Sequence, residues 1–263
     1  MSAAAAAPPP HETVGYDLPV WQTVVDAARQ DRYHRAAGVD GALHGGLGDL
    51  SVLANDCLHG ARPRDALGAT RLHAGVRVRQ AAPIPLGATL TVRARVDALI
   101  PAKRGRYIMI DFAFETADGA VPARIEHRSQ ILDPEPPADP APPRPAPMPT
   151  EGWRPLRRVQ LTPEMVTGYS AEFPHLEGHH DPEAAARIGM RAPIAQGLMG
   201  FTLLLAERMR LAPASRFDVE ARFVRPIFWD DALDLEAAGE TAFRALNPAG
   251  KTASEMLVWE WGG

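Results

Sequence analysis

The segment at residues 194–206 reads IAQGLMGFTLLLA, and it predicts a buried helix that opens near Gly197. The helix is apolar on nearly every face, which is typical of a helix enclosed by the protein core. The segment at residues 42–54 reads ALHGGLGDLSVLA and aligns with the first segment without a gap. Two such glycine-headed apolar helices, one in each half of the chain, predict an internal repeat.

Strand patterns follow both helices at matching places. VRVRQAAPI at residues 76–84 aligns with VEARFVRPI at residues 219–227, and TLTV at 89–92 aligns with ALDL at 232–235. Alternation of apolar and polar residues over short segments is typical of half-buried strands. Each half is therefore expected to hold a connecting helix, one long buried helix and several antiparallel strands. This is an α+β arrangement in which a sheet curls around a central helix.

A proline-rich stretch separates the two halves. Nine of the 18 residues from 133 to 150 are proline, which favours an extended linker over a helix or a central strand. The sequence thus predicts a disordered tail at 1–15, an N-terminal repeat at 16–132, the linker at 133–150 and a C-terminal repeat at 151–263.

Composition excludes several classes of function. The chain has 263 residues, 46% of them hydrophobic, and its formal net charge of −4 gives no general attraction to nucleic acid. Because Cys57 is the sole cysteine, the chain cannot form an internal disulfide or a thiolate metal cluster. The N-terminus lacks the pattern of a signal peptide, and no apolar run approaches the roughly 20 residues that cross a bilayer. We expect a soluble, cytoplasmic protein that binds neither nucleic acid nor membranes.

The two halves differ in a loop that only the second half carries. Tyr33 precedes His44 by 11 residues, whereas Tyr169 precedes the aligned Gln196 by 27. The additional 16 residues hold His175, Glu177, His179, His180 and Asp181. His175 and His179 are four residues apart, but this loop is not expected to be helical and no cysteine lies nearby, so no metal site is expected there. A histidine and acid loop in one copy alone predicts one active site per chain, in the second half.

This loop resembles the signature of a known enzyme family. HHDP at residues 179–182, followed by PIAQG at residues 193–197, is similar to the pattern D-x-N-P-L-H-x-D-P followed by P-I-x-H-G of the MaoC-like (R)-specific enoyl-CoA hydratases. The resemblance covers residues 160–263 well, and over residues 20–132 it rests mostly on the internal repeat. It implies a double hot-dog fold, in which two antiparallel sheets, each wrapped around a central helix, pack as a pseudo-dimer.

The resemblance also implies roles for individual residues. His179 would be the catalytic base, and the backbone N–H of Gly197 would stabilise the thioester oxygen. The substrate would be a 2-enoyl or 3-hydroxyacyl thioester of CoA or of an acyl-carrier protein, with no cofactor. The remaining substrate-binding residues expected from the match and its surroundings are His180, Asp181, Gln196, Leu198 and Arg191.

The sequence departs from the family signature at the catalytic acid. Pro174 stands five residues before His179, where the family has its aspartate, and Gln196 replaces the histidine of the His-Gly pair. Glu177 and Glu172 are the local carboxylates that could orient the imidazole in its place. Both glutamates are equally compatible with a solvated loop.

Other functions remain open at this point. Asp181 before Pro182 also fits a structural helix N-cap. A hot-dog protein that binds acyl thioesters without catalysis is one alternative, and pairing of two chains into a homodimer is compatible with the sequence. A thioesterase is another, because LHGG at residues 43–46 resembles the opening of hot-dog thioesterases. The acid of that class would fall at Leu53, whereas Asp49 lies at a different helical phase.

Overall fold

The computed structural model describes residues 12–61, 71–102, 105–132 and 146–262. Most of the predicted tail and of the predicted proline-rich linker lies outside these residues. Within these ranges, no helix has the length and apolar character needed to span a membrane.

Each half holds the predicted helices followed by strands, and each also begins with a strand that was not predicted. The N-terminal half holds β1 (Trp21–Val24), α1 (Ala27–Ala37), the short 3-10 helix η2 (Gly41–His44), α2 (Leu50–Ala61), β2 (Arg71–Gln80), β3 (Thr89–Ala102), β4 (Gly105–Glu115) and β5 (Ala123–Ile131). The C-terminal half holds β6 (Trp153–Gln160), α3 (Pro163–Tyr169), the 3-10 helix η3 (Glu177–His179), α4 (Pro182–Arg187), α5 (Gly197–Leu211), β7 (Arg216–Phe223), β8 (Ala232–Ala238), β9 (Ala242–Leu246) and β10 (Thr252–Gly262).

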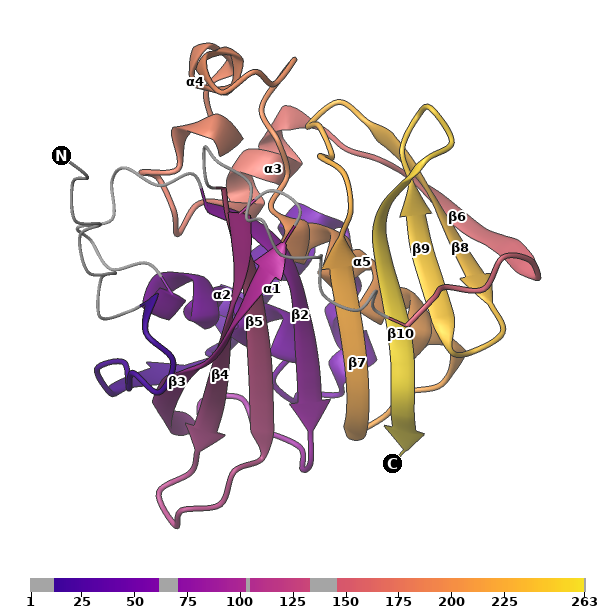
Figure 1. Ribbon diagram of the computed structural model, residues 1–263. Coiled ribbons are helices and arrows are strands. Elements are labelled where there is room, and N and C mark those ends of the chain that lie inside the picture. Colours follow the sequence, from indigo (N-terminus) through magenta and orange to yellow (C-terminus); the bar gives the residue numbers. More distant parts are fainter. Residues whose placement is uncertain (1–11, 62–70, 103–104, 133–145, 263) are drawn as a thin grey trace, which may run out of the picture.

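The named strands form one antiparallel sheet in the order β1-β3-β4-β5-β2-β7-β10-β9-β8-β6 (Figure 1). The prediction of two separate sheets is corrected here, because β2 and β7 pair from Gly75 with Arg222 to Gln80 with Phe217. This pairing satisfies the backbone groups that two open edges would otherwise expose. Counted outward from the joint, both halves have the same strand order.

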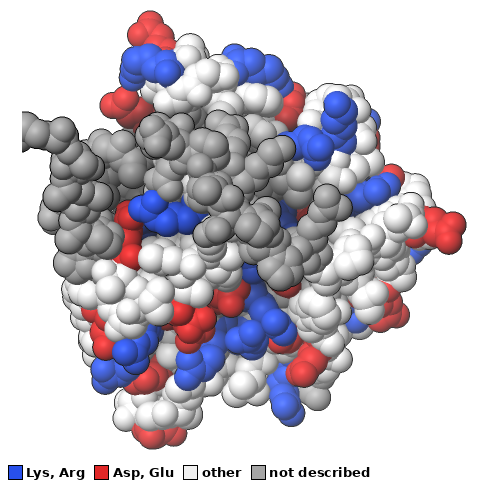
Figure 2. Space-filling model, in the orientation of Figure 1, with Lys and Arg blue, Asp and Glu red and all other residues white. Residues whose placement is uncertain are grey.

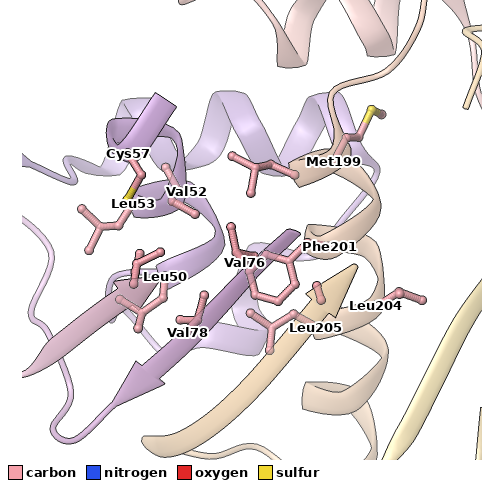
Figure 3. Close-up of a cluster of buried hydrophobic side chains, with 14 of the residues drawn as sticks. Leu50, Val52, Leu53, Cys57, Val76, Val78, Met199, Phe201, Leu204 and Leu205 are labelled. Carbon is pink, nitrogen blue, oxygen red and sulfur yellow. The ribbon is translucent and has the colours of Figure 1, made fainter. Parts of the chain in front are cut away.

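One face of the sheet is covered by the helices, and the two long helices occupy the core. Every residue of α5 from Leu198 to Met209 is buried, as expected for a helix that is apolar all round. Figure 3 shows side chains of α2, β2 and α5, among them Leu53, Val76 and Phe201, packed in one cluster. The core is therefore continuous across the two halves.

The opposite face of the sheet is charged. Figure 2 shows basic and acidic side chains beside one another over this face. Arg77 on β2 lies 2.7 Å from Asp218 on β7, so one of these ion pairs crosses the joint between the halves. Alternation of apolar and charged side chains along the strands explains why one face packs against helices while the other meets solvent.

The structure shifts the alignment of the two long helices by five residues. The Gly48 N–H donates to the Ile84 carbonyl at 2.7 Å, and the Ala195 N–H donates to the Ile227 carbonyl at 2.8 Å. Ile84 and Ile227 are the strand positions that the sequence alignment pairs, so Gly48 corresponds to Ala195. By the same count, the counterpart of Gln196 is Asp49, and not His44 as predicted.

The sequence alignment was wrong because it matched glycines that have different structural roles. Gly45 and Gly46 have φ angles of +56° and +80° and form a left-handed turn before α2, whereas Gly197 is itself the first residue of α5. The first residue of α2 is Leu50. Glycines that look equivalent in sequence therefore serve different purposes, a turn in one half and a helix start in the other.

Candidate functional site

The N-terminus of α5 is buried and lacks a side-chain cap. Gln196 occupies the N-cap position but makes no capping hydrogen bond. Both polar atoms of its amide are buried without a partner among the residues that the structure describes. The first N–H groups of a helix have no partner inside the helix, so this end can bind an oxygen that carries negative charge.

Gly197 is required by packing at this helix start. A Cβ atom at this position would lie 2.4 Å from the ring of Phe223 on β7. The ring of His73 on β2 lies 4.8 Å from the Phe223 ring, edge to face. Strand β2 of the N-terminal half therefore borders the helix start of the C-terminal half, which the sequence did not indicate.

His179 is fixed beside the segment that leads into α5. Its Nδ1 lies 2.6 Å from the carbonyl oxygen of Ile194, and the Ile194 N–H donates to the carbonyl of Gly178 at 3.1 Å. Because a carbonyl only accepts, Nδ1 carries the proton and Nε2 is the basic nitrogen of the neutral ring. His179 therefore contacts Ile194, which lies three residues before Gly197 in the sequence.

The two candidate carboxylates are both engaged in ion pairs. Glu177 is exposed and lies 3.0 Å from the guanidinium of Arg187. Glu172 lies 2.8 Å from Arg29, 2.5 Å from Arg32 and 3.5 Å from His59.

The carboxyl group of Glu172 has a lowered pKa and is therefore ionised at neutral pH. Burial alone would raise its pKa, but the hydrogen bond from His59 and the charge of Arg29 outweigh burial and hold the pKa well below its ordinary value. Arg29 also lies 2.9 Å from Asp56 on α2. Glu172 therefore links the two halves and is a weak proton acceptor.

Three of the expected substrate-binding residues have structural contacts. Asp181 accepts a hydrogen bond from the Glu183 N–H at 2.9 Å, which confirms the alternative interpretation as N-cap of α4. His180 Nε2 lies 3.3 Å from the carbonyl oxygen of Phe173. Leu198 is fully buried in the core.

Arg191 lies on the loop between α4 and α5. Its guanidinium pairs with Asp230 at 2.8 Å and with Asp231 at 2.6 Å, and it lies 4.1 Å from the centre of the Phe228 ring. Half of its side chain is exposed. It is therefore a positive charge at the surface, fixed near the bridge between Ile194 and Phe228.

The N-terminal half holds a buried cluster of His34, His44 and Asp49, which the sequence did not predict. His34 Nε2 lies 2.8 Å from Asp49 Oδ2, and His44 Nε2 lies 3.2 Å from the same oxygen. The two imidazole rings are stacked, with centres 5.0 Å apart. An alignment of the two halves that is counted from Ile84 and Ile227 places Asp49 at the start of α2, and this count would have pointed to the cluster.

A pocket of about 280 Å³ opens beside this cluster. His44 and Asp49 both contribute to its wall, together with the start of α2 and the end of α5. Its lining residues are Leu43, His44, Gly45, Leu47, Gly48, Asp49, Leu50, Gln80, Met209, Pro213, Ala214, Ser215 and Phe217. The wall is mostly apolar, apart from the histidine, the carboxylate and two other polar side chains.

An antiparallel sheet wrapped around long central helices is the hot-dog fold. No protein-family model matches the chain, and no curated protein matches it in sequence. HtdX from Mycobacterium tuberculosis is 18% identical, with a TM-score of 0.72 over 91% of this chain and 99% of that protein. A MaoC-like dehydratase from Phytophthora capsici is 19% identical, with a TM-score of 0.70 over 94% of this chain and 96% of that protein.

A third similar structure belongs to another class of enzyme. An acyl-ACP thioesterase from Bacteroides thetaiotaomicron is 12% identical, with a TM-score of 0.54 over 92% of this chain and 96% of that protein. The resemblance to MaoC-like proteins is thus confirmed at the level of the fold. Because dehydratases and a thioesterase share this fold, the reaction has to be argued from the residues of the site.

Proposed function

We propose that the protein is a cytoplasmic MaoC-like hydratase or dehydratase that acts on 2-enoyl or 3-hydroxyacyl thioesters of CoA or of an acyl-carrier protein. The reaction would take place at the start of α5. One observation carries the proposal: the hydrogen bond of 2.6 Å from His179 Nδ1 to Ile194 fixes a base beside the uncapped helix start at Gln196 and Gly197.

The proposed reaction is the addition of water to the carbon–carbon double bond. His179 Nε2 takes a proton from water while the water oxygen bonds to C3 of the enoyl group. The electrons of the double bond move toward the thioester, and the Gly197 N–H stabilises the negative oxygen of the enolate. The proton then passes to C2, which completes the 3-hydroxyacyl product, and dehydration runs through the same steps in reverse.

The polar residues around this start would divide the remaining tasks. The buried amide of Gln196 has unused hydrogen-bonding capacity and would hold the thioester or the hydroxyl group of the substrate. Glu177 is the better of the two candidate partners of His179, because its exposed pair with Arg187 is weak and easily exchanged. Glu172 would support the site through its ion pairs, and Arg191 would meet a phosphate of the carrier.

We also propose that the two halves are copies of one hot-dog unit, packed as a pseudo-dimer. Their shared strand order and the joint between β2 and β7 support this interpretation. Tyr33 of α1 and Tyr169 of α3, which the repeat aligns, also contact each other, with ring centres 4.9 Å apart.

Loss of the ultraviolet absorbance of crotonyl-CoA, which measures hydration of its double bond, tests the proposed activity. We expect turnover by the wild-type protein and a decrease of kcat of about 100-fold or more in His179→Ala. His179→Asn is the matched variant, because the asparagine amide retains a donor for the Ile194 carbonyl but has no basic nitrogen. It should be as inactive as the alanine variant while unfolding at a higher temperature.

Two outcomes would overturn the proposal. Binding of butyryl-CoA without hydration of crotonyl-CoA and longer 2-enoyl-CoA substrates would indicate a non-catalytic acyl-thioester protein. Full activity of His179→Asn would show that His179 is not the base.

A further inference from the structure

Asp49 is held so that one of its oxygens faces two histidines. Its backbone N–H donates to Gln30 Oε1 at 2.7 Å, and its Oδ1 accepts the Ser51 N–H at 2.8 Å. The other oxygen, Oδ2, is the one that meets His34 and His44. The first oxygen therefore caps α2, and the second is reserved for the imidazoles.

The carboxylate determines which nitrogen of His44 is basic. Although burial alone would raise the pKa of Asp49, the charges of His44 and His34 and the hydrogen bond from His34 hold it well below its ordinary value. An ionised Asp49 favours the proton of the His44 ring on Nε2, the nitrogen 3.2 Å away. The lone pair of the neutral ring then lies on Nδ1.

The turn before α2 places His44 in the pocket wall. Gly45 and Gly46, with positive φ angles, reverse the chain between His44 and the helix. Asp49 and Leu50, which begin α2, line the same pocket. A proton acceptor and a helix N-terminus therefore meet at one cavity.

The start of α2 offers a donor at the position that corresponds to Gly197. Leu50 is the first residue of this helix, and its N–H has no acceptor within the described part of the chain. The Asp49 carboxylate accepts only the next N–H, that of Ser51. The Leu50 N–H can therefore bind the oxygen of a carbonyl group that becomes negative.

A second, polar pocket of about 410 Å³ borders the first. The two share Gln80 and Phe217 in their walls. The second pocket contains Arg79 and Arg216, and it also contains the carboxylates of Asp218 and Glu260.

The charged side chains of the second pocket differ in whether they form ion pairs. Asp218 is already paired with Arg77 at 2.7 Å and with Arg79 at 3.3 Å. Arg216 forms no ion pair with the residues that the structure describes. A guanidinium beside an apolar pocket suits a ligand with an acyl group at one end and phosphates at the other.

We propose that the N-terminal half carries a second acyl-thioester site, which hydrolyses the thioester with His44 as general base. The acyl group lies in the apolar pocket at the start of α2, and the phosphate-bearing carrier extends toward Arg216. Asp49 is a positioning residue that fixes the tautomer of His44, and His34 in turn fixes Asp49. This site is separate from the one proposed at α5.

The reaction balances with water as the sole co-reactant. His44 Nδ1 takes a proton from water as the water oxygen bonds to the thioester carbonyl carbon, and the Leu50 N–H stabilises the resulting oxyanion. The C–S bond then breaks, and the thiolate leaves with the proton from His44. The products are a free carboxylic acid, which ionises in solution, and the free thiol of the carrier.

Butyryl-CoA is the decisive substrate, because a saturated acyl chain has no double bond to hydrate. Release of free CoA is followed with a thiol reagent on the full-length protein. We expect release by the wild-type protein, unchanged by EDTA, and a decrease of kcat of about 100-fold or more in His44→Gln. The glutamine amide retains a donor toward Asp49 but supplies no base.

Asp49→Asn tests the positioning role separately. Asparagine still caps α2, so folding should be retained, while kcat falls at least about tenfold with little change in KM. Asp40→Asn is the matched control, because Asp40 caps η2 through the Ala42 N–H and does not line the pocket. It should retain the wild-type kcat.

Three results would overturn the second site. These are no release of CoA by the wild-type protein, wild-type release by His44→Gln, or release that requires an added divalent metal. Hydration of crotonyl-CoA is measured in a separate assay, so failure at either site is recognised independently. Release of CoA without hydration would leave the α2 site standing and remove the α5 proposal, and the reverse result would do the opposite.

Discussion

The starts of α2 and α5 occupy equivalent places in the two halves but have opposite chemistry. At α2 the N-cap residue is Asp49, whose carboxylate caps the helix and binds two histidines. At α5 the N-cap residue is Gln196, which makes no capping bond and has a buried amide without a partner in the described residues. At α2 a side chain accepts one of the first N–H groups of the helix, that of Ser51, whereas at α5 no side chain does so.

The difference shows how a repeated fold can separate binding from stability. A side chain that caps a buried helix start adds stability, whereas an uncapped buried start costs free energy unless a ligand supplies the missing acceptor. The nearby carboxylates also differ, because Glu172 of the second half pairs with two arginines as well as His59, whereas Asp49 of the first half pairs with two histidines. Variants at both starts can test this contrast.

The largest effect on stability is expected at Arg29 of α1, which pairs with Glu172 of the C-terminal half. Arg29 is mostly buried and bridges Glu172 and Asp56. Its removal leaves two acidic groups close together without their main partner, so Arg29→Ala should lower the free energy of unfolding by about 3 kcal/mol. Urea denaturation measures this, and Arg158→Ala, which breaks an exposed pair with Asp234, should change it by less than about 1 kcal/mol.

A somewhat smaller effect is expected from closing the glycine start of α5. Gly197→Ala places a methyl group against the ring of Phe223, so we expect a loss of about 2 kcal/mol in the free energy of unfolding. Phe223→Ala should reduce the cost of the glycine substitution when the two are combined. Independent, additive effects in this double-mutant cycle would contradict the proposed clash.

The sequence predicts the fold well because the fold rests on periodicity. Alternating strands and apolar helices follow from residues such as those at 76–84 and 194–206, whose pattern is a direct consequence of burial. The joint between β2 and β7 was not predictable in this way. Pairing of two edges uses backbone groups that every residue has, so side-chain patterns carry little information about it.

The sequence predicted only the part of the site whose residues lie close to one another along the chain. HHDP and PIAQG lie close in sequence, and the structure joins them through His179 and Ile194. His34 lies on α1, His44 ends η2 and Asp49 precedes α2, and their meeting depends on the turn at Gly45 and Gly46. Aligning helices by their glycines hid this cluster, because glycine marks a flexible backbone and not one position in a fold.

A further prediction concerns the cap of α2 and its dependence on pH. Asp49→Ala should lower the free energy of unfolding by about 1 to 2 kcal/mol at neutral pH. The pKa of Asp49 is depressed in the folded protein, so its charge contributes stability above the ordinary pKa of a carboxyl group and loses it as the pH falls. The difference between wild type and Asp49→Asn should therefore shrink below about pH 4, as measured by thermal unfolding. A difference that stays constant down to pH 2 would contradict a charged role for Asp49.

The smallest effect is expected at the equivalent residue of the other half. Gln196 neither caps α5 nor has a partner for its amide in the part of the chain described, so Gln196→Leu removes a buried polar group without breaking a bond. We expect the free energy of unfolding to stay within about 1 kcal/mol of wild type or to increase, because the lost amide no longer pays a desolvation cost. The KM for hydration of crotonyl-CoA, which reports on the C-terminal half, should nevertheless increase. A loss of stability as large as that of Asp49→Ala would mean that the two helix starts are capped alike, and the contrast between them would disappear.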